Sequence, residues 1–145
     1  MNISLVSTKA LKIDLEPLFE EDIVDLDEDE SEEFDFRFDY SAHRPDKVDV
    51  KNSFAIAFKA LLQIPKDSVQ CSIVFLAQFH TDTDFEDDFL ESKFALINAP
   101  AIGYPFLRAF IANTLVNSGY EPLMLPTINF VSLYQNKNSN SDSKE

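Results

Sequence analysis

The residues best suited to acid–base or metal chemistry are few and scattered. The chain has two histidines, His43 and His80, and one cysteine, Cys71. His80 precedes Asp82 and Asp84, but typical zinc sites need three or four convergent ligands, and an acidic turn after a strand explains the same spacing. Cys71 begins an apolar run, which predicts a small buried side chain. The G-x-S-x-G motif of hydrolases is absent. We therefore predict no catalytic residues, no metal and no cofactor.

Aromatic residues are unusually abundant in this sequence. It has 14 Phe and 4 Tyr but no Trp, and Phe34, Phe36, Phe38 and Tyr40 alternate with charged residues. Such a stripe is most often one buried face of a strand. The remaining aromatic residues are too many for one four-stranded layer and one main helix to cover. This excess predicts a subunit interface or an exposed apolar groove.

Acidic residues are also abundant, and most of the excess negative charge lies in one segment. The net charge is −14 with a pI near 4.3, and ten of the fourteen residues 20–33 are Asp or Glu. We expect no binding to nucleic acid or to anionic lipid, because both need basic surface. Residues 20–33 are predicted to be a mobile loop. That loop would either maintain solubility or dock a basic partner.

Four alternating segments must position these groups. Strands are predicted over Ile3–Pro17, Glu33–Tyr40, Phe54–Ile64 and Val69–His80. The last of them is apolar on both faces around Val74, Phe75 and Leu76, which predicts that it is central or covered on both sides. Because the strands precede the helices rather than alternating with them, the fold class is α+β with a four-stranded antiparallel sheet.

The helical part follows the sheet. A short helical turn is predicted within Asp82–Glu91. Pro100 and Pro105 frame the entry to a long amphipathic helix that ends near Gly119, a suitable left-handed cap. Prolines keep 120–128 extended, and Asn129 can cap a short last helix through about Lys137. We predict one domain over 1–137 and a disordered polar tail over 138–145.

The cysteine count and the apolar runs of the sequence predict the compartment in which the protein works. A single cysteine excludes an internal disulfide and fits a reducing compartment. Met1–Lys9 shows no signal-peptide pattern, and no run of about 18 apolar residues is present. We expect a cytoplasmic protein without membrane insertion.

The segment Ile102–Tyr134 carries a series of motif residues: Tyr104, Pro105, Arg108, Gly119, Pro122, Leu123, Leu125, Pro126, Ile128, Asn129 and Phe130. In this combination the segment resembles the SecB family of protein-export chaperones. That family has a Phe/Tyr-Pro-aromatic-x-Arg entry to its long helix, a Gly some residues after the Arg, a Pro-x-Leu-x-Leu-x-Pro-like link and a Val/Ile-Asn-Phe opening of the last helix. Residues 3–98 match only in strand order and in a leading L-x-I-D-L-E-P.

The resemblance implies an ATP-independent holding chaperone. It would be a tetramer, built as a dimer of dimers around the long helix, and would hold unfolded preproteins in apolar grooves to keep them competent for export. The implied groove residues are Phe36, Tyr40, Leu123, Leu125, Ile128, Phe130, Leu133 and Tyr134. The implied oligomer interface comprises Phe106, Phe110 and Ile111.

The resemblance also implies an acidic patch that receives the basic tail of the SecA motor. Glu16 keeps one such acid, whereas Lys12 and the apolar stretch Ile73–Phe75 stand where others are expected. Either Glu28, Asp29 and Glu30 of the acidic run substitute for the missing acids, or the protein does not serve SecA.

Two other functions stay open. Within the family, the chaperone could be dedicated to one client, as in toxin–antitoxin–chaperone systems. From another class comes an acidic interaction protein that blocks a basic partner.

Overall fold

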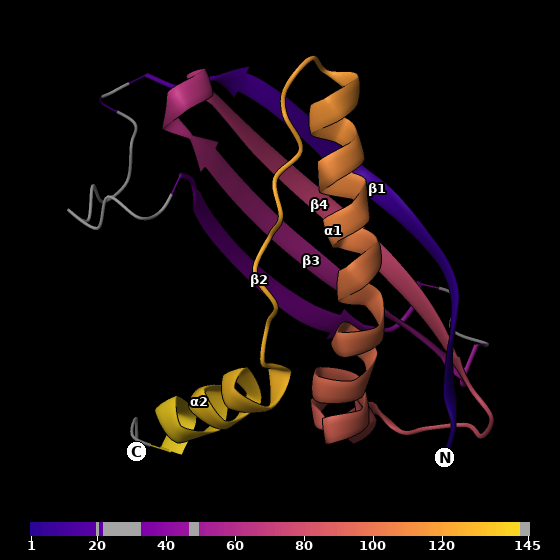
Figure 1. Cartoon of the computed structure of the whole chain (residues 1–145). Helices are drawn as coiled ribbons and strands as arrows, with labels where there is room; N and C mark the ends of the chain where they lie inside the picture. The colour runs from indigo at the N-terminus through magenta and orange to yellow at the C-terminus, as the bar shows by residue number, and fades with distance from the viewer. Residues whose placement is uncertain (20, 22–32, 47–49, 143–145) are drawn as a thin grey trace.

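A computed structural model describes residues 1–19, 21, 33–46 and 50–142, with side chains described as far as residue 137. Its four strands are β1 (Ile3–Pro17), β2 (Asp35–His43), β3 (Ser53–Ile64) and β4 (Val69–Thr81). They form one antiparallel sheet in the order β1-β4-β3-β2, and the long helix and the final segment lie across one of its faces (Figure 1). The predicted fold class is confirmed.

Alternation along β3 and β4 explains how the sheet acquires one covered face. Phe54, Ile56 and Phe58 of β3 are buried, while Lys59 on the opposite face is exposed. Cys71 of β4 is buried as predicted. Because β4 lies between β1 and β3, its outward side chains, among them Leu76, are still half-covered. Only Val74 and Leu76 make the outward face of β4 apolar, because the other outward residues, Gln70, Ser72, Gln78 and His80, are polar.

Two irregularities in β1 alter the simple alternation. Its register with β4 shifts between Leu5 and Ser7 and again between Ala10 and Lys12. Each shift inserts one extra residue, as in a β-bulge, so that Val6 and Leu11 have no direct partner across the strand pair. Both side chains are more than half exposed. The bulges therefore place aliphatic side chains outside the core.

Short helical segments lead from the sheet into the main helix. The turn η2 (Pro65–Asp67) joins β3 to β4, and η3 (Asp87–Glu91) and η4 (Phe94–Asn98) precede α1 (Ala99–Asn117). The long helix thus begins at Ala99, with Pro100 in its first turn, where a missing N–H costs nothing. Pro105 lies inside the helix rather than at its entry, which corrects the expected boundary.

Helix α1 packs closely on the sheet because Gly103 faces it. A Cβ at Gly103 would lie 3.0 Å from the Cβ of Ala77 and 3.2 Å from a ring carbon of Phe58. Leu107, Ile111 and Leu115 continue the same buried side of the helix. Glycine at this position lets α1 approach β3 and β4 and fixes which face of α1 is buried.

The end of α1 and the start of the last helix follow the sequence-based prediction. Gly119 has φ +94°, and the N–H groups of Gly119 and Tyr120 donate to the carbonyls of Val116 and Leu115, which is the Schellman arrangement. Residues 118–129, called the link below, then run back beside α1 to α2 (Phe130–Asp142), as Figure 1 shows. Asn129 Oδ1 accepts the N–H of Ser132 at 3.1 Å, so it is the N-cap. The helix α2 extends five residues beyond the expected boundary at 137.

One helical stretch of the described chain, Phe94–Asn117, is long and apolar enough to span a membrane by length and composition alone. The core helix of a folded domain meets the same test, and one side of α1 is buried against the sheet. The finding is therefore weak support for a membrane-spanning role.

Candidate functional site

The aromatic stripe of β2 meets the helical layer in one cluster. Phe38 packs on Phe58 of β3, on Tyr104 of α1 and on Phe130 of α2, with ring centroids 6.1, 5.7 and 6.0 Å apart. Tyr40 and Phe130 are in edge-to-face contact at 5.4 Å. Phe38 itself is only half-buried. The cluster joins β2, α1 and α2 and leaves part of its aromatic surface accessible.

Two tyrosine hydroxyls anchor the helical layer to this cluster. Tyr104 Oη donates to the carbonyl of Pro126 at 2.7 Å, which fastens the link to α1. Tyr40 Oη donates to the carbonyl of Leu96 at 2.8 Å, which fastens η4 to β2. Burial raises the pKa of Tyr104 to about 12 and also raises the pKa of Tyr40. Both phenols are therefore neutral hydrogen-bond donors near neutral pH.

A hollow lies between α1 and the link. A cavity of about 380 Å³ is lined by α1 residues 105, 108, 109 and 112 and by link residues 122–125. A smaller one of about 150 Å³ continues beside Tyr104, Thr127 and Ile128. Met124, at 84% exposure, is the most exposed large apolar side chain of the described residues. The two hollows and Met124 are called the α1–link groove below.

The structure places the predicted groove residues in two groups. Five are partly exposed and line the layer of β2, link and α2: Phe36, Leu123, Ile128, Leu133 and Tyr134. Three are buried and support them from beneath: Tyr40, Leu125 and Phe130. Sequence reasoning missed Met124 and the α1 wall of the groove around Arg108, since an Arg in a helix gives no such signal by itself. Their place in the link and on the outward side of α1 reveals them.

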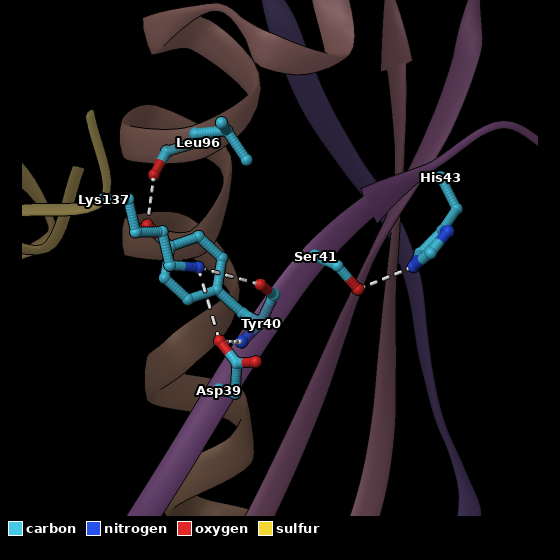
Figure 2. A network of polar contacts seen from close by, with 6 residues as sticks. All are labelled: Asp39, Tyr40, Ser41, His43, Leu96 and Lys137. Carbon is cyan, nitrogen blue, oxygen red and sulfur yellow. Dashed lines mark hydrogen bonds and ion pairs between the residues drawn. The ribbon is translucent and has the colours of Figure 1, made fainter. Parts of the chain in front are cut away.

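A polar contact holds α2 against β2. Figure 2 shows Lys137 reaching from α2 to β2, where its Nζ lies 3.3 Å from Asp39 Oδ1 and 3.2 Å from the carbonyl oxygen of Tyr40. The same ammonium lies 4.1 Å from the centroid of the Tyr40 ring. Asp39 Oδ1 also accepts the N–H of Tyr40 at 2.8 Å. Nothing in the sequence pattern indicated this contact, because its partners are 98 residues apart.

The predicted docking acids are only partly described. Glu16 is exposed on the outward face of β1, opposite Gln70. A hydrogen bond and charge repulsion from Asp14 raise the pKa of Glu16. Two carboxyl groups thus lie side by side on this face. Glu28, Asp29 and Glu30 lie outside the described residues, so their role stays a prediction.

The three predicted interface residues differ in exposure. Phe106 is 49% exposed on the outward side of α1, between Ile102 and Val116, which are also exposed. Phe110 is half-buried against Phe75, at 5.4 Å between ring centroids. Ile111 is 1% exposed, within the core of the single chain. An uncovered apolar side of α1 is therefore centred on Phe106.

The histidines do not form a ligand set. His43 and His80 make short hydrogen bonds with Ser41 and Ser53, at 2.6 and 2.7 Å. Both line a hollow of about 600 Å³ on the outward face of the sheet, beside the bulge residues Val6 and Leu11. In the part of the chain that the structure describes, no group of three or more potential metal-ligating side chains is found.

The sheet order, the long helix and the short last helix together define a SecB-like fold. A solved structure of the SecB-like chaperone Rv1957 of Mycobacterium tuberculosis, in complex with a ChAD peptide from the antitoxin HigA1, has the same fold, with a TM-score of 0.61 at 14% identity over 87% of both chains. A Streptococcus agalactiae protein of unknown function is similar with a TM-score of 0.51 at 13% identity, over 88% of this chain and 98% of that one.

The family is shown by sequence. The family model described as preprotein translocase subunit SecB matches residues 31–141, and this chain belongs to the SecB family. Among its relatives are the protein-export proteins SecB of Anaplasma phagocytophilum, 36% identical over 54% of each chain, and of Ehrlichia ruminantium, 32% identical over 46% of this chain and 42% of the relative. The chain spans about half the length of the curated relatives that it matches. The SecB family is not an enzyme family.

Proposed function

We propose that this protein is an ATP-independent holding chaperone that binds unfolded polypeptides and keeps them competent for export. The observation that carries the proposal is the α1–link groove beside the partly exposed β2 aromatic residues, in a chain of the SecB family. Relatives described as protein-export proteins SecB support the export part.

The groove suits a ligand without a fixed sequence. Its accessible apolar side chains, Met124, Leu123 and Ile128, offer contact area but no convergent set of polar groups. Burying one such side chain contributes about 1.5–3 kcal/mol, so that a single contact binds weakly. Several contacts along one extended chain then combine through effective concentration. Such a site accepts many sequences and needs no nucleotide.

The remaining parts of the proposal concern assembly and surroundings. The protein would act as a homotetramer, a dimer of dimers in contact through the uncovered side of α1 around Phe106. Its clients would be unfolded preproteins in the cytoplasm. It would have no catalytic activity, no cofactor and no inserted membrane segment. Its net charge of −14 also disfavours a nucleic-acid partner.

Docking of the SecA motor is proposed for the carboxyl pair on β1. Glu16 and the adjacent Asp14 present negative charge on the outward face, which a basic tail complements. We expect Glu16→Lys to weaken binding of the zinc-loaded SecA tail peptide, measured by calorimetry at low salt, because it reverses one charge of the pair. Lys9→Glu is the control of opposite sign on the same strand, and we expect it not to weaken binding. Unchanged affinity of Glu16→Lys would remove this docking site.

The alternatives are separated by their ligands. A client-dedicated chaperone would bind the C-terminal extension of one antitoxin far more tightly than generic unfolded chains. The acidic interaction protein would bind a folded basic partner and no unfolded chain. Membership of the SecB family favours the holding chaperone over this third function.

The first test is suppression of client aggregation. Light scattering of α-lactalbumin after reduction should stay low when the protein is present without nucleotide. Met124→Glu should weaken client affinity about tenfold, since it replaces an apolar contact worth about 1.5 kcal/mol. Val6→Glu, with the same charge change at an exposed site on the outward face of the sheet, is the matched control. If the wild-type protein never suppresses aggregation, the holding function is wrong.

A further inference from the structure

The edge of β2 near Tyr40 is closed by side chains. In the sheet order β1-β4-β3-β2, β2 is an edge strand, and its pairing with β3 is regular from Asp35 to His43. An edge strand presents unpaired N–H and C=O groups that invite another strand. Here the Tyr40 N–H donates to Asp39 Oδ1 and the Tyr40 carbonyl accepts from Lys137 Nζ. Both backbone groups that would pair with an added strand are therefore occupied.

The two side chains imitate the groups of a neighbouring strand. A carboxylate oxygen 2.8 Å from the Tyr40 N–H stands in for a peptide carbonyl, and an ammonium 3.2 Å from the Tyr40 oxygen stands in for a peptide N–H. The two groups are also joined to each other, since Lys137 Nζ lies 3.3 Å from the same Asp39 oxygen. Figure 2 shows the three residues in this arrangement.

The ion pair between Lys137 and Asp39 is exposed to solvent and therefore easily displaced. The side chains of Lys137 and Asp39 are 46% and 77% exposed, and ion pairs of such exposure hold weakly because water and salt screen them. Tyr40, by contrast, is held firmly by its buried ring and by its hydroxyl bond to Leu96. Removing Lys137 would therefore free the Tyr40 carbonyl and the end of α2, while the exposed Asp39 side chain would still have to turn away from the Tyr40 N–H.

We propose that the Asp39–Lys137 ion pair is a removable plug on the edge of β2, and that an extended segment of an unfolded polypeptide displaces both side chains from the Tyr40 backbone groups and adds to β2 as a fifth strand. The inference rests on the proposed holding function and names the backbone site of that function. In a regular antiparallel pair, residues two apart turn their N–H and C=O groups to the same edge, so that Phe38 and Ala42 extend the site on either side of Tyr40. The apolar side chains of the added strand would face the β2 aromatic cluster.

The occupant is an extended peptide rather than a folded partner for two reasons. The groups that hold Tyr40 have the donor and acceptor arrangement of a backbone, which is the recognition chemistry of strand addition. The neighbouring side chains Phe36 and Phe38 are half-buried aromatic residues, which select apolar side chains on one face of the peptide.

The test uses the full chain and a fluorescent nine-residue peptide of alternating Leu and Thr. Lys137→Met keeps the length of the side chain but removes the ammonium, and it should tighten peptide binding about twofold to fivefold, the range expected for loss of an exposed ion pair. Lys51→Met, an exposed site before β3, has the same charge change and should leave the affinity unchanged. Circular dichroism confirms that each variant is folded.

Two further measurements separate strand addition from simple uncovering of aromatic side chains. The same peptide is N-methylated at its odd or at its even residues, each of which removes the donors of one peptide edge. With Lys137→Met, at least one methylated peptide should lose the gain in affinity. Hydrogen exchange of the Phe38, Tyr40 and Ala42 amides should slow when the unmethylated peptide is bound.

Each outcome has a distinct meaning. If the wild-type protein suppresses client aggregation but Lys137→Met binds the peptide no more tightly, or both methylated peptides keep the gain, the plug is overturned while the holding function stands. If neither the wild-type protein nor Lys137→Met binds the peptide or the unfolded client, the holding function and the plug are both overturned.

Discussion

Tyr104 shows how one side chain supports the candidate site. Its ring packs with Phe38 and Phe130 in the aromatic cluster, and its hydroxyl holds the link at Pro126. The sequence marked Tyr104 only as part of a motif at a helix entry. Its structural role depends on the link returning beside α1, which is a tertiary event. Residue type and spacing could identify the participants but not the contact between them.

We expect Tyr104→Phe to lower the free energy of unfolding by about 1 kcal/mol at neutral pH, because the Pro126 carbonyl loses its donor. Chemical denaturation measures the change. Tyr120→Phe is the control, since its hydroxyl makes no hydrogen bond among the described residues. Equal stability of Tyr104→Phe and the wild-type protein would mean that water replaces the bond without cost.

The same hydroxyl predicts a pH dependence. The pKa of Tyr104 is raised from 10 to about 12 in the folded chain, so the folded state keeps a proton that the unfolded state loses. Stability contributed by this group is complete below pH 10 and falls as the pH rises toward 12, by about 2–3 kcal/mol in total. Tyr40 shifts in the same direction. Urea denaturation at pH 8, 10 and 11 should show a shallower decline for Tyr104→Phe than for the wild-type protein.

At the scale of elements, apolar alternation predicts the strands and Pro17 and Pro65 mark the ends of two of them, whereas Pro105 misplaces one helix boundary. The alternation of apolar residues predicted four strands, and the observed bounds differ from the expected ones by three residues at most. Gly119 and Asn129 cap the helices as expected, because capping depends on local backbone geometry. Pro105 misled, since a helix packed against a sheet tolerates the loss of one hydrogen bond in its interior.

Other features of the elements left no usable signal in the sequence. The two β1 bulges depend on the register with β4, which is known only once the strands pair. The Lys137 contact with β2 likewise depends on where α2 lies after the link. Local order therefore follows from local sequence in this chain, whereas the α1–link groove and the Lys137 contact arise from how the link and α2 pack on the sheet and on α1. The candidate site therefore exists only in the folded chain and cannot be predicted from local sequence patterns.

At the scale of the whole molecule, apolar surface remains on the side of α1 that faces away from the sheet. Ile102, Phe106 and Val116 are each at least 39% exposed, on a helix whose other side is fully buried. Three exposed apolar side chains on one side of a helix, in a chain with a net charge of −14, favour a specific contact with another copy over a solvent-exposed role. A symmetric assembly through this side would also place several α1–link grooves on one particle, so that one long client could engage more than one of them.

Phe106→Glu tests that assembly. Placing a carboxylate in the centre of an apolar contact would leave it buried without a partner, and we expect the variant to be a smaller species than the tetramer proposed for the wild-type protein. Light scattering after size exclusion measures the mass. Val131→Glu, a similarly exposed site on α2, is the control and should keep the wild-type mass.

If assembly supplies the avidity, Phe106→Glu should also lose most of its affinity for a long unfolded client while keeping its affinity for a nine-residue peptide, which fits one groove. A wild-type protein that is monomeric, or a Phe106→Glu variant that stays tetrameric, would contradict the interface.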